Sequence, residues 1–194
     1  MAYLIGLTGT HSTGKSTFIE KIREQAAGKG ITVTTIADMA TNCRNTGFGI
    51  LKDHTFESTL WIMCSVIKAE LEAALKFDLV LVDRPVSDAL GYLEAALEAT
   101  GRSIDQTQRA YLYKLVEMHL PRYSLLFKTE LDLSIPLGEG RDTDLDFRVK
   151  ADKWIAHTLK TLNATTRSLD ASASESIESL IATILRSKGE ERKH

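Results

Sequence analysis

The stretch GTHSTGKS, residues 9–16, decides the fold of this 194-residue chain. It satisfies the pattern G-x-x-x-x-G-K-[ST] and follows a short apolar run at residues 3–7, which is typical of a strand buried on both faces. Residues 15–27 then place apolar side chains at helical spacing, and Gly28 and Gly30 end that helix. A buried strand, a glycine-rich turn and a helix in this order predict a loop that binds the phosphates of a nucleoside triphosphate.

Each residue type in this loop has a physical task. Glycines let the backbone approach the phosphates closely, while successive N–H groups and the helix N-terminus supply positive potential. We expect Lys15 to neutralise the β and γ oxygens as a catalytic group, and Ser16 to bind Mg²⁺. His11 is expected to shape the loop, and Thr17 to support the nucleotide or the start of the helix. The predicted phosphate-binding residues are Gly9, Thr10, His11, Ser12, Thr13, Gly14, Lys15, Ser16 and Thr17.

The rest of the chain alternates between strands and helices. Apolar runs rich in β-branched residues predict strands, and apolar residues every three or four positions predict helices. The expected strands lie at residues 31–36, 78–82, 124–127 and 166–169. The expected helices lie at 55–76, from a Ser87 cap to about 99, from an Asp105 cap to Pro121, at the end of the segment 141–162, and at 174–187. Residues 37–53 show no clear period and are expected to form a loop or a short helix.

This alternation predicts the fold class. Parallel strands need long crossover connections, so the chain should form a mostly parallel sheet covered on both faces. The expected class is α/β, a three-layer P-loop NTPase fold with a five-stranded parallel sheet and a mobile lid segment at about residues 138–150. No internal repeat or flexible linker divides the chain, so we expect one domain at residues 1–188 and a disordered tail at 189–194.

Composition narrows the possible partners. The chain is 43% hydrophobic and 26% charged, which is ordinary for a soluble globular protein, and its net charge of −2 shows no general affinity for polyanions. The two cysteines, Cys43 and Cys64, lack CxxC spacing and are expected to be reduced thiols. No stretch approaches the ~20 apolar residues of a membrane span. These features predict a cytoplasmic protein with no membrane partner.

A second group of candidate residues lies at the end of the 78–82 strand. Asp83 and Arg84 follow this buried strand directly, and the carboxyl ends of parallel strands open into the ligand crevice of such sheets. Asp83 could hold Mg²⁺ through water or accept a proton from an attacking hydroxyl, and Arg84 could hold an anionic acceptor. The alternative is that Asp83 caps the next turn and Arg84 is solvated.

Weaker candidates surround this strand end. Asp38 lies just past the 31–36 strand and could bind the acceptor, although a capping role is equally compatible. Arg44 is a further possible anion contact. Asp88 and Tyr92, in the next helix, are expected to cap and to pack.

The predicted lid contains a polar segment, GEGRDTDLDFR, at residues 138–148. If it is helical, Arg141 and Arg148 fall on one face and could converge on the transferring phosphoryl group when the segment closes. The alternative is that both are solvated on a surface loop. A calcium loop is excluded, because Phe147 stands where glycine is required and Lys153 where glutamate is required. Asp144 fits an N-cap.

The loop GTHSTGKST, the stretch FDLVLVDRPVSDALGYL and the lid segment resemble P-loop nucleoside and nucleotide kinases. The resemblance is strongest to AAA-like ATPase/kinase domains that include the ribosylnicotinamide kinase part of bacterial NAD-biosynthesis regulators. It is more distant to thymidylate and deoxynucleoside kinases, and Pro85 stands where thymidylate kinases usually have an aromatic residue. The resemblance implies a central first strand, Asp83 as base or metal-water ligand, and Arg141 and Arg148 as lid residues.

These observations predict a phosphotransferase that uses ATP and Mg²⁺ to move the γ-phosphoryl group to a nucleoside or nucleotide acceptor. One alternative is a kinase that acts on a modified base or an end within DNA or RNA. Another is a nucleotide-dependent switch or binding module with slow ATP hydrolysis. The sequence leaves a monomer and a homodimer both open.

Overall fold

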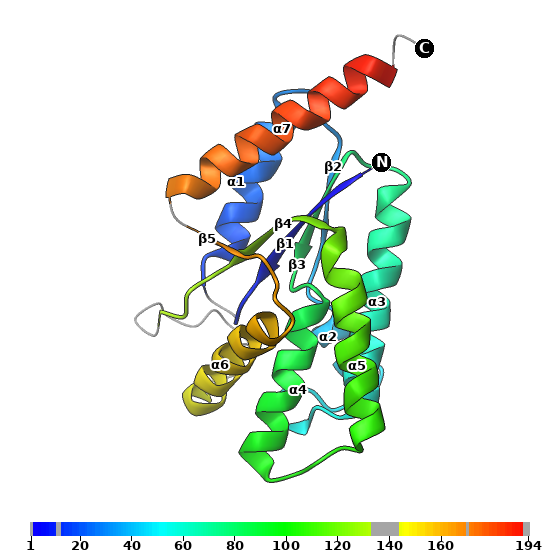
Figure 1. Ribbon diagram of the computed structural model, residues 1–194, viewed down its shortest axis with the longest axis vertical. Helices are drawn as coiled ribbons and strands as arrows, with labels where there is room; N and C mark the ends of the chain where they lie inside the picture. Colours follow the sequence, from blue (N-terminus) through cyan, green and yellow to red (C-terminus); the bar gives the residue numbers. More distant parts are fainter. Residues whose placement is uncertain (1, 11–12, 133–143, 170, 192–194) are drawn as a thin grey trace.

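Five parallel strands form one sheet in the computed structural model, which describes residues 2–10, 13–132, 144–169 and 171–191. The strand order is β2-β3-β1-β4-β5, so the first strand is central, as the resemblance implied (Figure 1). The predicted five-stranded parallel sheet is confirmed. The strands are β1 (Tyr3–Thr8), β2 (Val33–Ile36), β3 (Leu79–Asp83), β4 (Tyr123–Lys128) and β5 (Arg167–Ser168).

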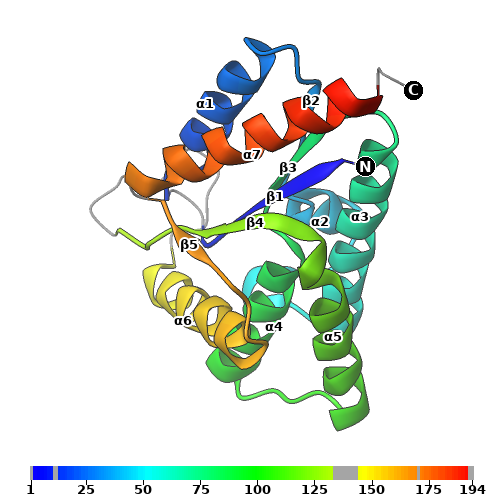
Figure 2. The same ribbon diagram turned by 45° about the horizontal axis from the view of Figure 1, so that its top comes forward.

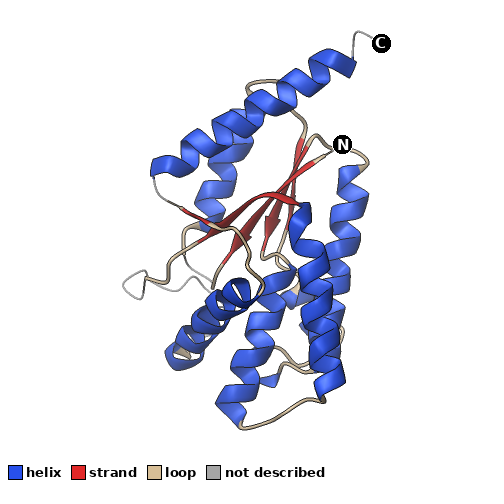
Figure 3. Cartoon of the chain, in the orientation of Figure 1, coloured by secondary structure: helices blue, strands red, loops and turns tan. Residues whose placement is uncertain are grey.

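Helices cover both faces of the sheet, which confirms the three-layer α/β class (Figures 2 and 3). One face carries α1 (Lys15–Ala27) and α7 (Ala171–Glu191). The other face carries α3 (Phe56–Ala74), α4 (Val86–Thr100), α5 (Gln106–His119) and α6 (Leu145–Thr161). The short helix α2 (Ala40–Asn45) and the 3₁₀ turns η1 (Leu51–Asp53) and η2 (Leu120–Arg122) complete the described elements.

Strand β3 shows why the sheet needs both layers of helices. Side chains alternate across a strand, so Val80 and Val82 pack in the core beneath α3 and α4, while Leu79 and Leu81 pack beneath α1 and α7. All four are fully buried. Each such burial stabilises the fold by about 1.5–3 kcal/mol, so neither face can be left open to water.

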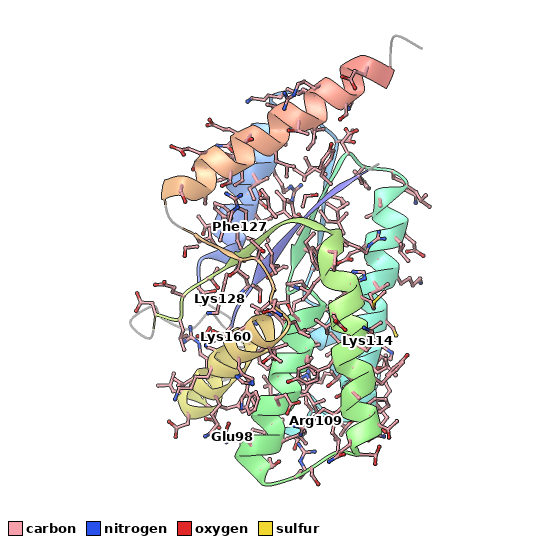
Figure 4. All side chains as sticks on the ribbon, viewed as in Figure 1. Glu98, Arg109, Lys114, Phe127, Lys128 and Lys160 are labelled. Carbon is pink, nitrogen blue, oxygen red and sulfur yellow. The ribbon has the colours of Figure 1, made fainter. Side chains whose placement is uncertain are left out.

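Helix α1 is fixed to the sheet by an aromatic pair. Phe127, labelled on β4 in Figure 4, meets Phe18 of α1 edge to face, with 5.4 Å between the ring centroids. Phe18 follows the start of α1 by one turn. The contact therefore holds the N-terminus of α1 close to the ends of β1 and β4.

Helices α4 and α6 approach closely at Gly91. A Cβ atom on Gly91 would lie 2.5 Å from Ile155 Cγ1 and 2.8 Å from the Ile155 Cα, distances that no real side chain tolerates. Gly91 therefore lets the two helix backbones touch. The first turns of α4, next to the end of β3, are held firmly by this contact.

The structure corrects some predicted boundaries. Ser87 is not the N-cap of α4, because the helix begins one residue earlier, at Val86, and Ser87 is buried in its first turn. Pro85 occupies the cap position, and since proline has no backbone N–H it leaves no donor unsatisfied there. Helix α7 continues to Glu191, through the first three residues assigned to a disordered tail, and residues 192–194 lie outside the described part. The predicted caps Asp105 and Asp144 are confirmed, because both side chains accept backbone N–H bonds.

The segment 37–53 forms α2 and η1 with connecting turns, in agreement with the predicted loop or short helix. Of the helices in the described residues, none has an apolar stretch long enough to cross a bilayer.

Candidate functional site

The glycine-rich loop folds around the ammonium group of Lys15. This group donates hydrogen bonds to the carbonyl oxygens of Gly9, at 3.0 Å, and Thr10, and lies 3.3 Å from the Thr13 hydroxyl. Lys15 is only 5% exposed. Burial, followed by the nearby Arg84 guanidinium, lowers the pKa of Lys15 to about 8. The loop thus confines a positive charge among backbone groups.

Thr129, just past the end of β4, supports this loop from behind. Its N–H donates to the Thr8 carbonyl at 3.0 Å, and its hydroxyl lies 2.7 Å from that of Thr13. Gly9 has φ of +132°, and a Cβ there would lie 2.2 Å from the Thr129 hydroxyl. Gly14, at the start of α1, has φ of +85°. Both glycines of the motif therefore occupy positions that other residues fill poorly.

Asp88, in the first turn of α4, accepts hydrogen bonds from the start of the loop. The Gly9 N–H donates to Asp88 Oδ2 at 3.0 Å, and the Thr8 hydroxyl donates to Oδ1. The carboxyl group is almost fully buried, and this burial raises the pKa of Asp88 to about 6, against the opposing effect of the two hydrogen bonds. Asp88 therefore ties α4 to the phosphate-binding loop.

The remaining residues of the predicted loop occupy different environments. Thr10 is buried, whereas Ser16 and Thr17 are exposed on the first turn of α1. His11 and Ser12 lie outside the described residues.

Asp83 is the last residue of β3 and pairs in register with Leu7 of β1, two residues before Gly9. Its Oδ1 atom is buried and has no hydrogen-bond partner among the described residues. A buried carboxylate oxygen is costly unless it accepts a hydrogen bond, so this atom suits a hydroxyl or a metal-bound water.

Arg84 turns the chain sharply after β3. Its φ of +68° is rare for a residue with a side chain, and its N–H donates to the Leu7 carbonyl at 3.1 Å. The guanidinium pairs with Asp38, with 3.0 Å between Nε and Oδ2, and lies 5.1 Å from the centre of the Tyr92 ring. The strained turn thus aims Arg84 away from the sheet and toward the end of β2.

A pocket opens beside the loop, and we call it the side pocket. Its wall combines polar residues from the ends of β2 and β3, from α2, from the turn before α3 and from α4. The polar and aromatic residues that line it are Asp38, Thr41, Arg44, His54, Arg84, Asp88 and Tyr92. The structure therefore brings the three predicted acceptor residues, Asp38, Arg44 and Arg84, into one wall.

Of the two predicted lid arginines, Arg141 and Arg148, the structure describes only Arg148. Helix α6 begins at Leu145, so Arg148 lies in its first turn but Arg141 precedes it and lies outside the described residues. Arg148 is 1% exposed, so the alternative that both arginines are solvated on a surface loop is wrong for Arg148. Packing of α6 on α4 buries this turn. Arg148 is not among the described residues that line the side pocket.

Sequence reasoning missed the roles of Asp88, Tyr92, His54 and Thr129. Asp88 and Tyr92 are four residues apart, so a helix places both on one face, and this spacing is the signal that was available. His54 and Thr129 stand in segments without a motif. Only the folded chain shows that they adjoin the side pocket and the loop.

No group of three or more His, Cys, Asp or Glu side chains is arranged to hold a metal among the described residues. Mg²⁺ in nucleotide sites uses one or two protein oxygens together with phosphates and waters, so the Ser16 hydroxyl and the Asp83 carboxylate suffice as a donor set.

The fold and the loop define the class: an α/β protein with a phosphate-binding P-loop. A family model described as AAA domain matches residues 4–175, and the chain belongs to this family. No match was found among curated proteins.

Solved structures of deoxyadenosine kinase from M. mycoides are similar to this chain. The complex with the products dCMP and a flexible dCDP has a TM-score of 0.61 and 17% identity, covering 95% of this chain and 99% of that one. The dATP complex gives 0.61 and 15%, covering 93% and 98%. The dCTP complex gives 0.60 and 17%, covering 95% and 99%. The predicted resemblance to P-loop nucleoside kinases is thereby confirmed for the fold.

Proposed function

We propose that this protein is a phosphotransferase that moves the γ-phosphoryl group of ATP to a hydroxyl of a nucleoside or nucleotide. One observation carries the proposal: the side pocket opens next to the P-loop at the same edge of the sheet. A hydrolase or a nucleotide switch needs only the phosphate site, whereas a kinase needs a second site for its acceptor. The similar kinase structures hold dATP, dCTP, and dCMP with dCDP, which supports a nucleoside class of acceptor.

The charges around Lys15 support a shared reaction centre. Asp83, Asp88 and Asp38 raise its pKa, and Arg84 lowers it, so all four groups act on the same ammonium. Charged groups from β3 and from the side pocket therefore influence the ammonium that the proposal places against the phosphates.

In this proposal the loop binds the triphosphate. Lys15 exchanges its bonds to the Gly9 and Thr10 carbonyls for bonds to phosphate oxygens, and the N–H groups at the start of α1 face the same charge. Ser16, and Asp83 through water, would hold Mg²⁺. When bound, this ion neutralises charge that develops on the phosphates during transfer.

Asp83 orients the acceptor hydroxyl and takes its proton. The hydroxyl oxygen forms a bond to the γ-phosphorus, the bond from that phosphorus to the bridging oxygen of ADP breaks, and the proton passes to the buried Oδ1 of Asp83. Asp38 and Arg84, already paired, hold the acceptor together with Arg44. We assign charge stabilisation of the transferring group to Arg141 and, from the first turn of α6, to Arg148.

The remaining features fit a single-domain cytoplasmic enzyme. Cys43 is a buried free thiol and Cys64 an exposed one, which suits a reducing compartment. We propose that residues 1–188 form one domain.

The test is ADP release from ATP and Mg²⁺ with a panel of nucleosides, nucleoside monophosphates, nicotinamide riboside and short single-stranded DNA. One acceptor class should stimulate ADP release and yield a phosphorylated product by mass spectrometry. Asp83→Asn should lower kcat about 100-fold, because the amide cannot take the proton. Glu178→Gln, an exposed change on α7, is the matched control and should leave kcat unchanged. Slow ADP release that no acceptor stimulates would contradict the kinase proposal and favour a nucleotide switch.

A further inference from the structure

His54 is a buried imidazole in the wall of the side pocket. Its Nδ1 lies 2.9 Å from the carbonyl oxygen of Leu51. A carbonyl only accepts hydrogen bonds, so Nδ1 carries the proton and donates. Burial lowers the pKa of His54 to about 4, so the ring is neutral at physiological pH. The other nitrogen, Nε2, is therefore an uncharged hydrogen-bond acceptor.

The turn before His54 is built tightly. Leu51 has φ of +58°, a left-handed conformation that is uncommon for leucine. A Cβ on Gly49 would lie 2.6 Å from the Asp53 carbonyl oxygen. Arg102, just after α4, donates from Nη2 to the Lys52 carbonyl at 2.5 Å. Strained turns persist when their surroundings hold them, and functional sites are where such strain gathers.

The ring of His54 is also fixed from the side of α4. It stacks on Tyr92, with 5.8 Å between ring centroids and 29° between their planes. The guanidinium of Arg84 lies on the same Tyr92 ring. Three planar groups thus line the wall of the side pocket, which combines the charged Asp38–Arg84 pair with a neutral acceptor.

We infer that His54 determines acceptor specificity: Nε2 accepts a hydrogen bond from an N–H or O–H group of the nucleoside base or sugar. The inference rests on the proposed function, because it assigns the side pocket to a nucleoside. An analogue without that donor, or with an acceptor in its place, leaves Nε2 unpaired in a buried site. A site built around a hydrogen bond rejects such analogues strongly.

The experiment measures equilibrium binding by calorimetry without ATP, so that it does not depend on phosphoryl transfer. The probes are pairs that differ in one donor: adenosine and purine riboside, cytidine and pyrimidin-2-one riboside, and each ribonucleoside with its 2′-deoxy form. The wild-type protein should prefer the donor member of one pair by about 10-fold or more. His54→Phe keeps a flat ring but removes the acceptor, and should reduce this preference to about 3-fold or less by weakening the donor ligand alone. His54→Gln restores an acceptor oxygen and should recover part of the preference.

Several results would overturn the inference. An unchanged preference in His54→Phe, an equal loss for both members of the pair, or no binding of any probe to the wild-type protein would each do so. The wild-type protein could also bind the donor ligand selectively, lose this selectivity in His54→Phe, and release no ADP with any acceptor. This result would support the role of His54 and contradict the proposed phosphotransferase function.

A second measurement uses the wild-type protein alone and guards against a variant that does not fold. The ¹⁵N signal of His54 Nε2 should move when the preferred nucleoside is added, while Nδ1 stays protonated. An unmoved Nε2 signal at a saturating concentration of a nucleoside that binds would contradict the assignment.

Discussion

The P-loop and the side pocket lie next to each other, yet the chain builds them in different ways. The P-loop comes from eight consecutive residues, and it works through backbone N–H groups, glycine conformations and one lysine. The side pocket collects side chains from six parts of the chain between Asp38 and Tyr92: the ends of β2 and β3, the turn before α3, and helices α2, α3 and α4. Under the proposed function, a phosphate, which is the same in every nucleotide, would be bound by a contiguous motif, and an acceptor by dispersed side chains.

Asp88 is the residue that both regions share. Its carboxylate binds the Thr8 hydroxyl and the Gly9 N–H, and it also lines the side pocket. A substitution at Asp88 should therefore affect both regions at once.

The largest expected effect separates the two regions at Lys15. Lys15→Met should lower kcat/KM for ATP at least about 1,000-fold, because the loop loses its only side-chain cation for the phosphates. Nucleoside binding to the side pocket should change less than about 3-fold. An ADP-release assay measures kcat/KM and calorimetry measures nucleoside binding, and Lys29→Met, an exposed change just past α1, is the control. An equal loss of nucleoside affinity would show that the two regions are one site.

The next largest effect is a pH dependence of the free energy of unfolding that is caused by Asp88. The folded-state pKa of Asp88 is about 6, above its ordinary value of 3.8, so the folded protein holds this proton more tightly than the unfolded chain does. The resulting stability is complete below about pH 3.8 and is lost as the pH rises to about 6, a fall of about 3 kcal/mol in the free energy of unfolding.

Denaturant unfolding from pH 3 to pH 7 measures this fall. Asp88→Asn cannot ionise, so the difference between wild type and variant should change by that amount over this range. A constant difference would mean that Asp88 has an ordinary pKa in the fold.

The smallest effect should be confined to the side pocket. Arg84→Lys removes the planar group that lies over Tyr92 and pairs through Nε with Asp38, and an ammonium cannot do both. Acceptor affinity should fall about 10-fold, and affinity for an ATP analogue less than about 2-fold. Arg23→Lys, in an exposed pair on α1, should change neither. A larger loss for the ATP analogue than for the acceptor would place Arg84 with the phosphates.

Much of the fold could be predicted because its signals are local. Buried strands such as β3 are continuous apolar runs, and the caps Asp105 and Asp144 act within three residues. Strand β5 has only two residues, and its place at the sheet edge depends on pairing with β4. The start of α4 was mispredicted because serine is a good cap in isolation, while Pro85 fixes the start one residue earlier.

Outside the P-loop motif, most of the correctly predicted site residues follow the end of a strand. Asp38, Asp83 and Arg84 follow strands, and the sheet brings such positions to one edge. Arg148 was predicted as a residue of a polar lid segment because its neighbours are polar, but it is buried in the first turn of α6. His54 has no local signal, since its tautomer and its place in the wall depend on Leu51 and Tyr92 in the folded chain.

The two free thiols should react with a thiol reagent at different rates. Cys64 on α3 is open to solvent, so a thiol reagent should label it at once. Cys43 is fully buried in α2, with its Sγ directed at the Ser58 carbonyl, and burial raises its pKa. Neighbouring residues of α2 line the side pocket, so we expect Cys43 to be labelled in a slower phase, when α2 moves away from Ser58. A ligand bound in the side pocket should slow this phase further.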